Sequence, residues 1–175
     1  YDFKFSSLGR AGILVLLFAS LSFLTIGFLF SNNMTLMLHP ENWGAYLGNS
    51  SGTLLNTADI TLWPRYLHFM IGGTAVGGLF VALYGRFLAR KDQTLGDYAS
   101  AVGMKLFITL TILQIAVGVW FLLALPKAQM LLFMGDHRLA TAFFLAALLL
   151  ITLTLVAALK KKLYAALILL MVLIY

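Results

Sequence analysis

Long apolar runs separated by short polar stretches dominate the chain. They predict helices at about residues 11–31, 62–88, 100–125, 137–159 and 163–175, with an outer loop at 32–61. A helix needs roughly 20 apolar residues to cross a bilayer, and lipid tolerates only structures that satisfy their own backbone hydrogen bonds. The pattern therefore predicts an all-α fold, a transmembrane helical bundle of about four to five helices in a single domain over residues 1–175.

Composition strengthens this interpretation. Hydrophobic residues make up 62% of the chain and charged residues 10%, and the mean hydropathy is +0.97. A water-soluble domain of this size cannot hide so much apolar surface. The chain has no cysteine, which excludes disulfides, iron–sulfur clusters and haem attached through cysteine.

The net charge of +6 is concentrated in alternate loops, which argues against nucleic acid as the partner. The loop at 31–60 has no Lys or Arg, whereas the basic residues gather at two other connections, as Arg86, Arg90, Lys91 and Lys105 and as Lys160, Lys161 and Lys162. Cytoplasmic loops of membrane proteins carry the excess of Lys and Arg. We therefore expect a multi-pass membrane protein with a cytoplasmic N-terminus and an outward-facing 31–60 loop.

His68 is the main candidate for chemistry, because it lies inside the apolar run from Leu62 to Leu88. Ionisable residues within membrane helices are costly and usually functional. Gly72 and Ala75 follow His68 on the same helical face, at spacings of four and seven. These small residues predict room either for a flat group such as a porphyrin or for a close neighbouring helix.

Haem b is the cofactor that these residues favour, since haem needs only one or two axial ligands. A zinc site needs three or four ligands, and the only glutamate is Glu41 in the outer loop. His68 is the expected ligand of the haem iron, and His137, Met130 and Met134 are candidates for the second. Trp63, Arg65 and Tyr66 would lie at the haem edge, where Arg65 would pair with a propionate, and Gly72 would admit the macrocycle.

Two other polar residues are not expected to bind a cofactor. His39 is expected to be a solvated loop residue, and Asp136 is expected to be the N-cap of the helix that follows Asp136.

The stretch from about Met37 to Leu125 resembles part of subunit I of the cytochrome bd quinol oxidases. The resemblance rests on Met37-Leu38-His39-Pro40 at the start of an outer loop, on Pro64 with His68 four residues later, on the small residues after His68, and on a basic turn before the next apolar helix. In that family the matching histidine is an axial ligand of the low-spin b haem near the outer face. The resemblance thus implies the same role for His68.

The chain also departs from that family. It has no histidine in its first helix, no glutamate within an apolar run and only a short connection at 126–137, so we do not expect it to reduce oxygen by itself. We expect a haem-b electron-transfer subunit of a bacterial respiratory or photosynthetic complex, between quinone and an outward-facing redox protein such as a c-type cytochrome. The alternative is a cofactor-free accessory or structural transmembrane subunit among other membrane subunits.

Overall fold

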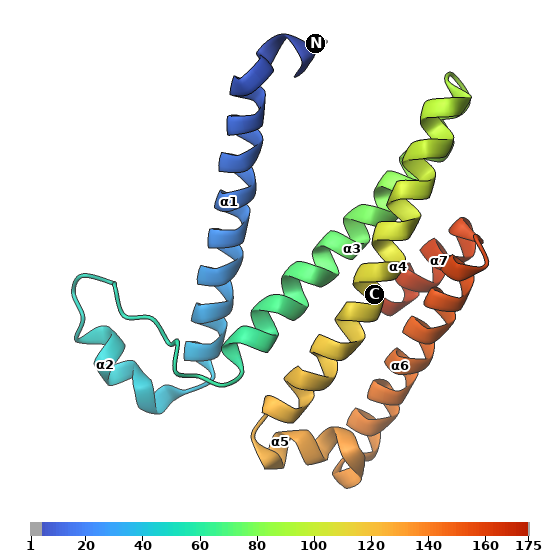
Figure 1. Cartoon of the computed structure of the whole chain (residues 1–175). Helices are drawn as coiled ribbons and strands as arrows, with labels where there is room; N and C mark the ends of the chain where they lie inside the picture. Colours follow the sequence, from blue (N-terminus) through green and yellow to red (C-terminus); the bar gives the residue numbers. More distant parts are fainter. Residues whose placement is uncertain (1–4, 175) are drawn as a thin grey trace. The chain divides into compact units, whose positions relative to one another are not determined.

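The computed structural model describes residues 5–174, and within them it contains helices and no strands. Four helices are long and apolar enough to cross a membrane, namely Gly9–Met37, Leu62–Leu88, Gln93–Ala124 and Arg138–Leu159. Most of their large apolar side chains are exposed, as Phe18 (74%) and Phe143 (75%) illustrate. Such surfaces are compatible with lipid and not with water. The prediction of an all-α multi-pass membrane protein is confirmed (Figure 1).

The contacts divide the chain into two units, Tyr1–Tyr66 and Leu67–Tyr175, with the boundary inside helix α3 (Leu62–Leu88). Unit 1 contains α1 (Phe5–Met37), the 3-10 turn η1 (Pro40–Asn42), the short helix α2 (Trp43–Leu47) and the start of α3. Unit 2 contains the rest of α3 and then α4 (Gln93–Ala124), α5 (Lys127–Leu131), the π-helical turn η2 (Leu132–Asp136), α6 (Arg138–Leu159) and α7 (Leu163–Ile174).

Helix α1 continues to Met37, past the expected end near residue 31. The polar residues at its end, Ser31, Asn32 and Thr35, are almost fully buried. Thr35 Oγ1 donates to the Asn32 carbonyl (2.8 Å), and Asn32 Oδ1 accepts from the Asn56 amide (2.7 Å). These polar side chains pack against the returning loop and so prolong the helix where the sequence pattern indicated its end.

The starts of α4 and α6 also differ from expectation. Helix α4 begins at Gln93, not near residue 100, because the Asp92 side chain caps it by accepting from the Leu95 amide (3.0 Å). The N-cap of α6 is His137, whose Nδ1 accepts from the Ala140 amide (3.2 Å), so the expectation for Asp136 is wrong. Gly135 has φ of +130°, a backbone conformation that glycine adopts readily. The chain turns at this residue, and His137 then directly precedes α6.

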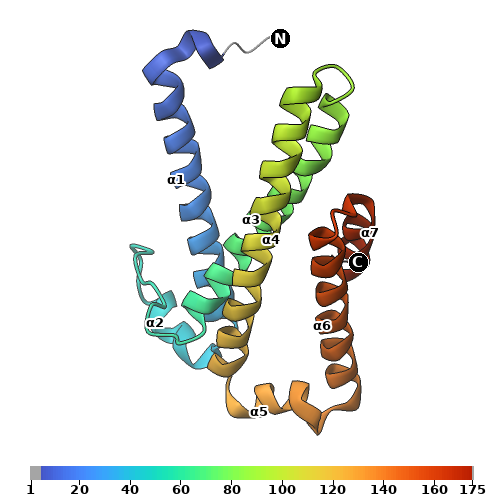
Figure 2. The same cartoon turned by 45° about the vertical axis from the view of Figure 1, so that its right-hand side comes forward.

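Helices α3 and α4 form a close antiparallel hairpin along a line of small residues, which we call the glycine seam: Gly78 and Gly85 of α3 with Gly96 and Gly103 of α4 (Figure 2). A Cβ on Gly78 would lie 2.9 Å from the Phe107 amide nitrogen. A Cβ on Gly103 would overlap the backbone of Ala82. Close backbone approach at small residues is the usual way in which membrane helices associate.

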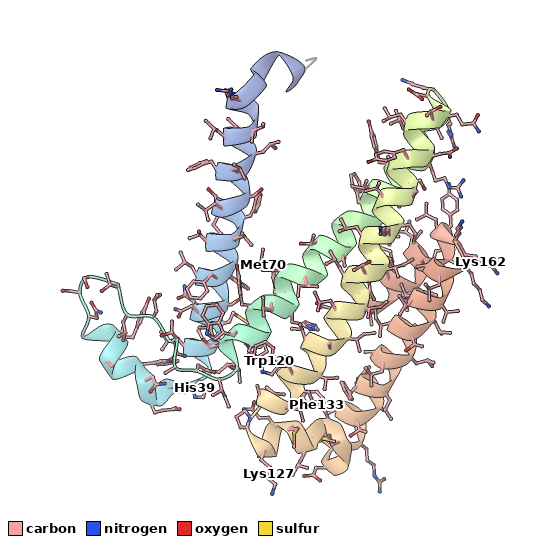
Figure 3. The ribbon with its side chains drawn as sticks, in the orientation of Figure 1. His39, Met70, Trp120, Lys127, Phe133 and Lys162 are labelled. Carbon is pink, nitrogen blue, oxygen red and sulfur yellow. The ribbon has the colours of Figure 1, made fainter. Side chains whose placement is uncertain are left out.

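The core of unit 2 joins four helices. It is formed by Ala75, Leu79 and Ala82 of α3, Phe107 of α4, Ala157 and Ala158 of α6, and Leu163, Ala166 and Leu170 of α7. Because α4 and α6 run in opposite directions, the basic turns at 89–92 and 160–162 both lie on the side of unit 2 away from α5, with the α6–α7 turn below the tip of the α3–α4 hairpin (Figure 2). Lys162 lies at the α6–α7 turn and Lys127 at the α5 end (Figure 3).

Candidate functional site

The His68 ring lies against the backbone of α4 near the α5 end of unit 2. Its Cε1 and Nδ1 atoms are 3.2 and 3.5 Å from the position that a Cβ on Gly118 would take. The ring also stacks on Phe121, with centroids 6.4 Å apart and planes 29° apart. The missing side chain of Gly118 therefore leaves room for the imidazole of His68. The sequence of α3 alone did not predict that Gly118 lies beside His68.

Two polar atoms in this region are buried without a hydrogen-bond partner among the described residues: Nδ1 of His68 and Oε1 of Gln114. The other ring nitrogen of His68, Nε2, also makes no hydrogen bond in that part of the chain, but it is not buried. Buried polar groups normally have partners. His68 therefore has one ring nitrogen that is not fully buried, Nε2, and one buried ring nitrogen, Nδ1, without a hydrogen-bond partner among the described residues.

The space beside Gly72 is filled by α4. A Cβ on Gly72 would lie 2.9 Å from Gln114 Nε2, and Ala75 is buried in the core with 4% exposure. Of the two alternatives for this face, the structure shows the close neighbouring helix. The end of the Gln114 side chain lies in the space beside Gly72 between α3 and α4, and the expectation that Gly72 admits a macrocycle stays a prediction.

The candidates for a second ligand lie at the same end of unit 2 as His68, on α5 and the turns around it. His137 caps α6 through Nδ1, Met130 is half-buried, and Met134 is 60% exposed. Among the described residues, none of the interactions of His68 involves these three side chains. The described part of the chain also holds no group of three or more His, Cys, Asp or Glu residues arranged to bind a metal ion. Within residues 5–174, His68 is the only histidine inside a helix long enough to cross a membrane.

The residues expected at the haem edge make contacts within unit 1. Trp63 and Tyr66 pack on Phe28, with ring centroids 5.6 and 5.8 Å from it, and the Tyr66 hydroxyl donates to the Leu24 carbonyl (3.2 Å). Arg65 is half-buried and interacts electrostatically with Asp59. The contacts of Trp63 and Tyr66 pack the first residues of α3 against α1 within unit 1. A pairing of Arg65 with a propionate stays a prediction.

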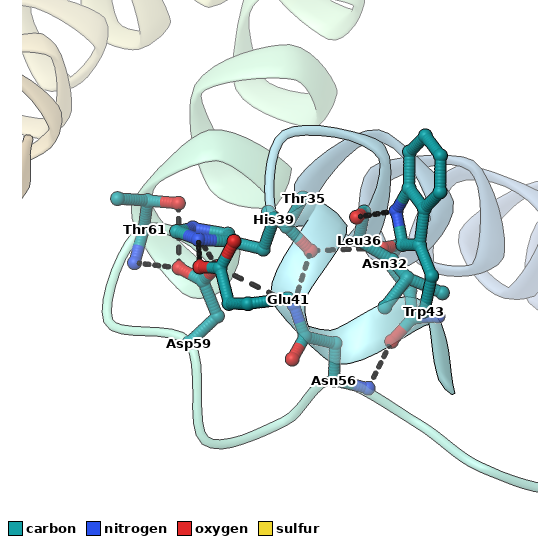
Figure 4. A network of polar contacts seen from close by, with 9 residues as sticks. All are labelled: Asn32, Thr35, Leu36, His39, Glu41, Trp43, Asn56, Asp59 and Thr61. Atoms are coloured by element: carbon teal, nitrogen blue, oxygen red, sulfur yellow. Dashed lines mark hydrogen bonds and ion pairs between the residues drawn. The ribbon is translucent and has the colours of Figure 1, made fainter. Parts of the chain in front are cut away.

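A polar network in the outer loop is the feature that sequence reasoning missed (Figure 4). His39 lies between two carboxylates, with Nδ1 2.8 Å from Glu41 Oε1 and Nε2 3.1 Å from Asp59 Oδ2. Asp59 Oδ1 accepts from the Thr61 amide and hydroxyl, both at 2.7 Å, and Asn56 Nδ2 donates to Asp59 Oδ2 (3.3 Å). His39 is therefore a structural bridge and not a solvated residue. The Asp59-Ile60-Thr61 sequence before α3 was the available signal, since Asp side chains often accept from the backbone two residues later.

Comparison of the chain with protein-family models, with curated proteins and with solved structures finds no match.

Proposed function

We propose that this chain is a membrane-embedded electron-transfer subunit that supplies His68 as one axial ligand of a b haem shared with another membrane subunit. The observation that carries the proposal is the imidazole of His68, whose Cε1–Nδ1 edge lies against Gly118 of α4 and whose Nε2 is not fully buried and has no hydrogen-bond partner among the described residues. Imidazole nitrogen is a common axial ligand of haem iron. When bound, the haem would supply one-electron chemistry.

This chain could line only one side of a haem. Gln114 fills the space beside Gly72 between α3 and α4, so the macrocycle would have to lie outside the hairpin. A partner subunit would then close over it and supply most of its pocket. The second ligand would come from that partner or from His137, Met130 or Met134, at the same end of unit 2.

The assignment to a respiratory or photosynthetic complex rests on the resemblance of residues 37–125 to cytochrome bd subunit I. Under this proposal the subunit exchanges electrons with a membrane quinone and with an outward-facing redox protein such as a c-type cytochrome. The same resemblance implies a location in the bacterial inner membrane, and the clustering of Lys and Arg in alternate loops supports a cytoplasmic N-terminus.

The test is the reduced-minus-oxidised absorption spectrum of the complex purified from its native membrane. We expect the b-type bands to vanish in His68→Ala, because a non-covalent haem loses its bond to this chain. His39→Ala is the matched control and should leave the spectrum intact, since His39 is engaged with Glu41 and Asp59 in the outer loop. A full haem complement in His68→Ala would refute the proposal. Loss of a low-spin signature in His137→Ala, Met130→Leu or Met134→Leu would identify the second ligand within this chain.

A cofactor-free accessory subunit is the second candidate, and the filled space beside Gly72 favours it. In that case His68 would hydrogen-bond to a neighbouring subunit. His68→Ala would then release this chain from the complex without changing the haem content of the remaining subunits, and blue-native electrophoresis with a haem stain separates this outcome from the first.

A further inference from the structure

A cavity of about 300 Å³ opens beside the last turns of α3, at the end of unit 2 with the two basic turns. Its lining includes Phe80, Tyr84, Arg86 and Phe87 from α3, Arg90 from the turn that follows α3, and Tyr164 from the first turn of α7. The volume lies at the lower end of the range for small-molecule pockets. The cavity thus combines two guanidinium groups with aromatic walls.

Among the described residues, no carboxylate neutralises the positive charge in this cavity. Within residues 5–174 neither Arg86 nor Arg90 forms an ion pair with a carboxylate, and the Arg90 guanidinium lies 5.6 Å from the centre of the Phe87 ring. The nearby Asp92 carboxylate is engaged in capping α4. Lys91 and the lysines at 160–162 add further positive charge to this end.

The cavity also lies at the level where lipid headgroups are expected. Helix α3 ends at Leu88, so Arg86 and Arg90 lie on either side of its last residue. Tyr84 and Tyr164 each combine an apolar ring with a polar hydroxyl, and such residues are enriched at the membrane–water boundary. Phe80, which is 67% exposed, continues the cavity toward the apolar part of the helix.

The geometry points to a binding site for an anionic phospholipid, with its phosphate on Arg86 and Arg90 and the start of an acyl chain along Phe80. Arginine binds phosphate with paired hydrogen bonds, and basic pockets between membrane helices are suited to anionic headgroups. The apolar and aromatic walls favour a lipid over free phosphate. No histidine or carboxylate lines the cavity to exchange a proton with a quinol, so a quinone reaction site is disfavoured.

The experiment is native mass spectrometry of the full chain after mild removal of lipid, with phosphatidylglycerol and phosphatidylcholine of identical acyl chains as probes. We expect preferential retention of phosphatidylglycerol, and a loss of that preference on the order of fivefold per arginine in Arg86→Gln/Arg90→Gln. Both arginines are exposed, so these substitutions should leave the fold intact, and helicity by circular dichroism checks this.

The matched control is Lys91→Gln/Lys162→Gln, which removes the same charge at the same end of unit 2 but outside the cavity lining. The control should retain the preference. An equal loss in the two double variants would show a diffuse charge effect and overturn the site. Unchanged retention in the arginine variant, or displacement of the lipid by inorganic phosphate alone, would overturn it as well.

Discussion

At the scale of single residues, Asp59 organises the outer loop. Its side chain is only 7% exposed and interacts with Thr61, Asn56 and His39. His39 contacts Asp59 through Nε2 and Glu41 through Nδ1. Polar contacts therefore hold the end of α1 to the residues before α3.

Replacing Asp59 with Asn should loosen this loop. In the amide group one carboxylate oxygen becomes an NH2 donor. This donor would face either His39 Nε2 and Asn56 Nδ2 or the amide and hydroxyl donors of Thr61. An unsatisfied buried polar group costs about 1–3 kcal/mol. Hydrogen exchange should therefore accelerate by roughly 5- to 150-fold at the Asn56 and Thr61 amides. Glu41→Gln, at a side chain that is 67% exposed, should change exchange little. Equal protection in wild type and Asp59→Asn would contradict the network.

Glu41 gives the loop a pH dependence. A hydrogen bond from its own backbone amide, and next the contact with His39, hold the pKa of Glu41 below its ordinary value of 4.5. Because the folded-state pKa is depressed, the contact stabilises the loop fully above the ordinary value and is lost as the pH falls through the folded-state value. A carbon-13 NMR titration should show a midpoint below 4.5.

His39→Gln is the control for that titration. The midpoint should rise only part of the way toward the ordinary value, since the backbone hydrogen bond is the larger cause and remains. A midpoint that returns fully to the ordinary value would assign the whole effect to His39 and contradict the structure.

At the scale of helices, the glycine seam decides how α3 and α4 pack. The small residues Gly78, Ala82 and Gly85 are spaced by four and three residues, and Gly96, Ser100 and Gly103 repeat this spacing on α4. An alternation of three and four residues keeps one face of each helix toward its partner. His68 and Gly72 continue this face toward the α5 end, which explains why α4 fills the space beside them.

Gly103→Ala should destabilise the hairpin, because the new Cβ would overlap the backbone of Ala82. Backbone has little freedom to move, and overpacking costs about 1–3 kcal/mol. Gly77→Ala is the matched control, since its Cβ would meet nothing within 4 Å. Reversible unfolding in mixed micelles should show a lower free energy of unfolding for Gly103→Ala and not for Gly77→Ala. Equal stability of the two variants would mean that the seam is looser than the structure shows.

At the scale of the whole molecule, charge in alternate loops predicts the sidedness of the protein. Ser51 lies in the loop without Lys or Arg, and Gln93 follows the basic turn at the end of α3. One membrane-crossing helix, α3, separates them, so they should face opposite sides.

Single cysteines introduced at Ser51 and Gln93 test this sidedness, since the chain has no cysteine of its own. An impermeant maleimide added to intact cells should label Ser51→Cys and leave Gln93→Cys unlabelled until the membrane is opened. Labelling of both from one side would remove α3 as a membrane-crossing helix, and the reverse pattern would invert the topology.

The sequence by itself determined the class of fold and predicted about four to five apolar helices, of which four are long enough to cross a membrane, because apolar length and backbone hydrogen bonding leave few alternatives in lipid. It also singled out His68, since an imidazole within an apolar run is conspicuous. Only the tertiary structure decided what faces each small or polar residue: Gly118 and Phe121 beside His68, Gln114 beside Gly72, and Asp59 beside His39. The physical reason is that helical spacing gives the face of a residue but not its neighbour, which depends on contacts between segments far apart in the chain.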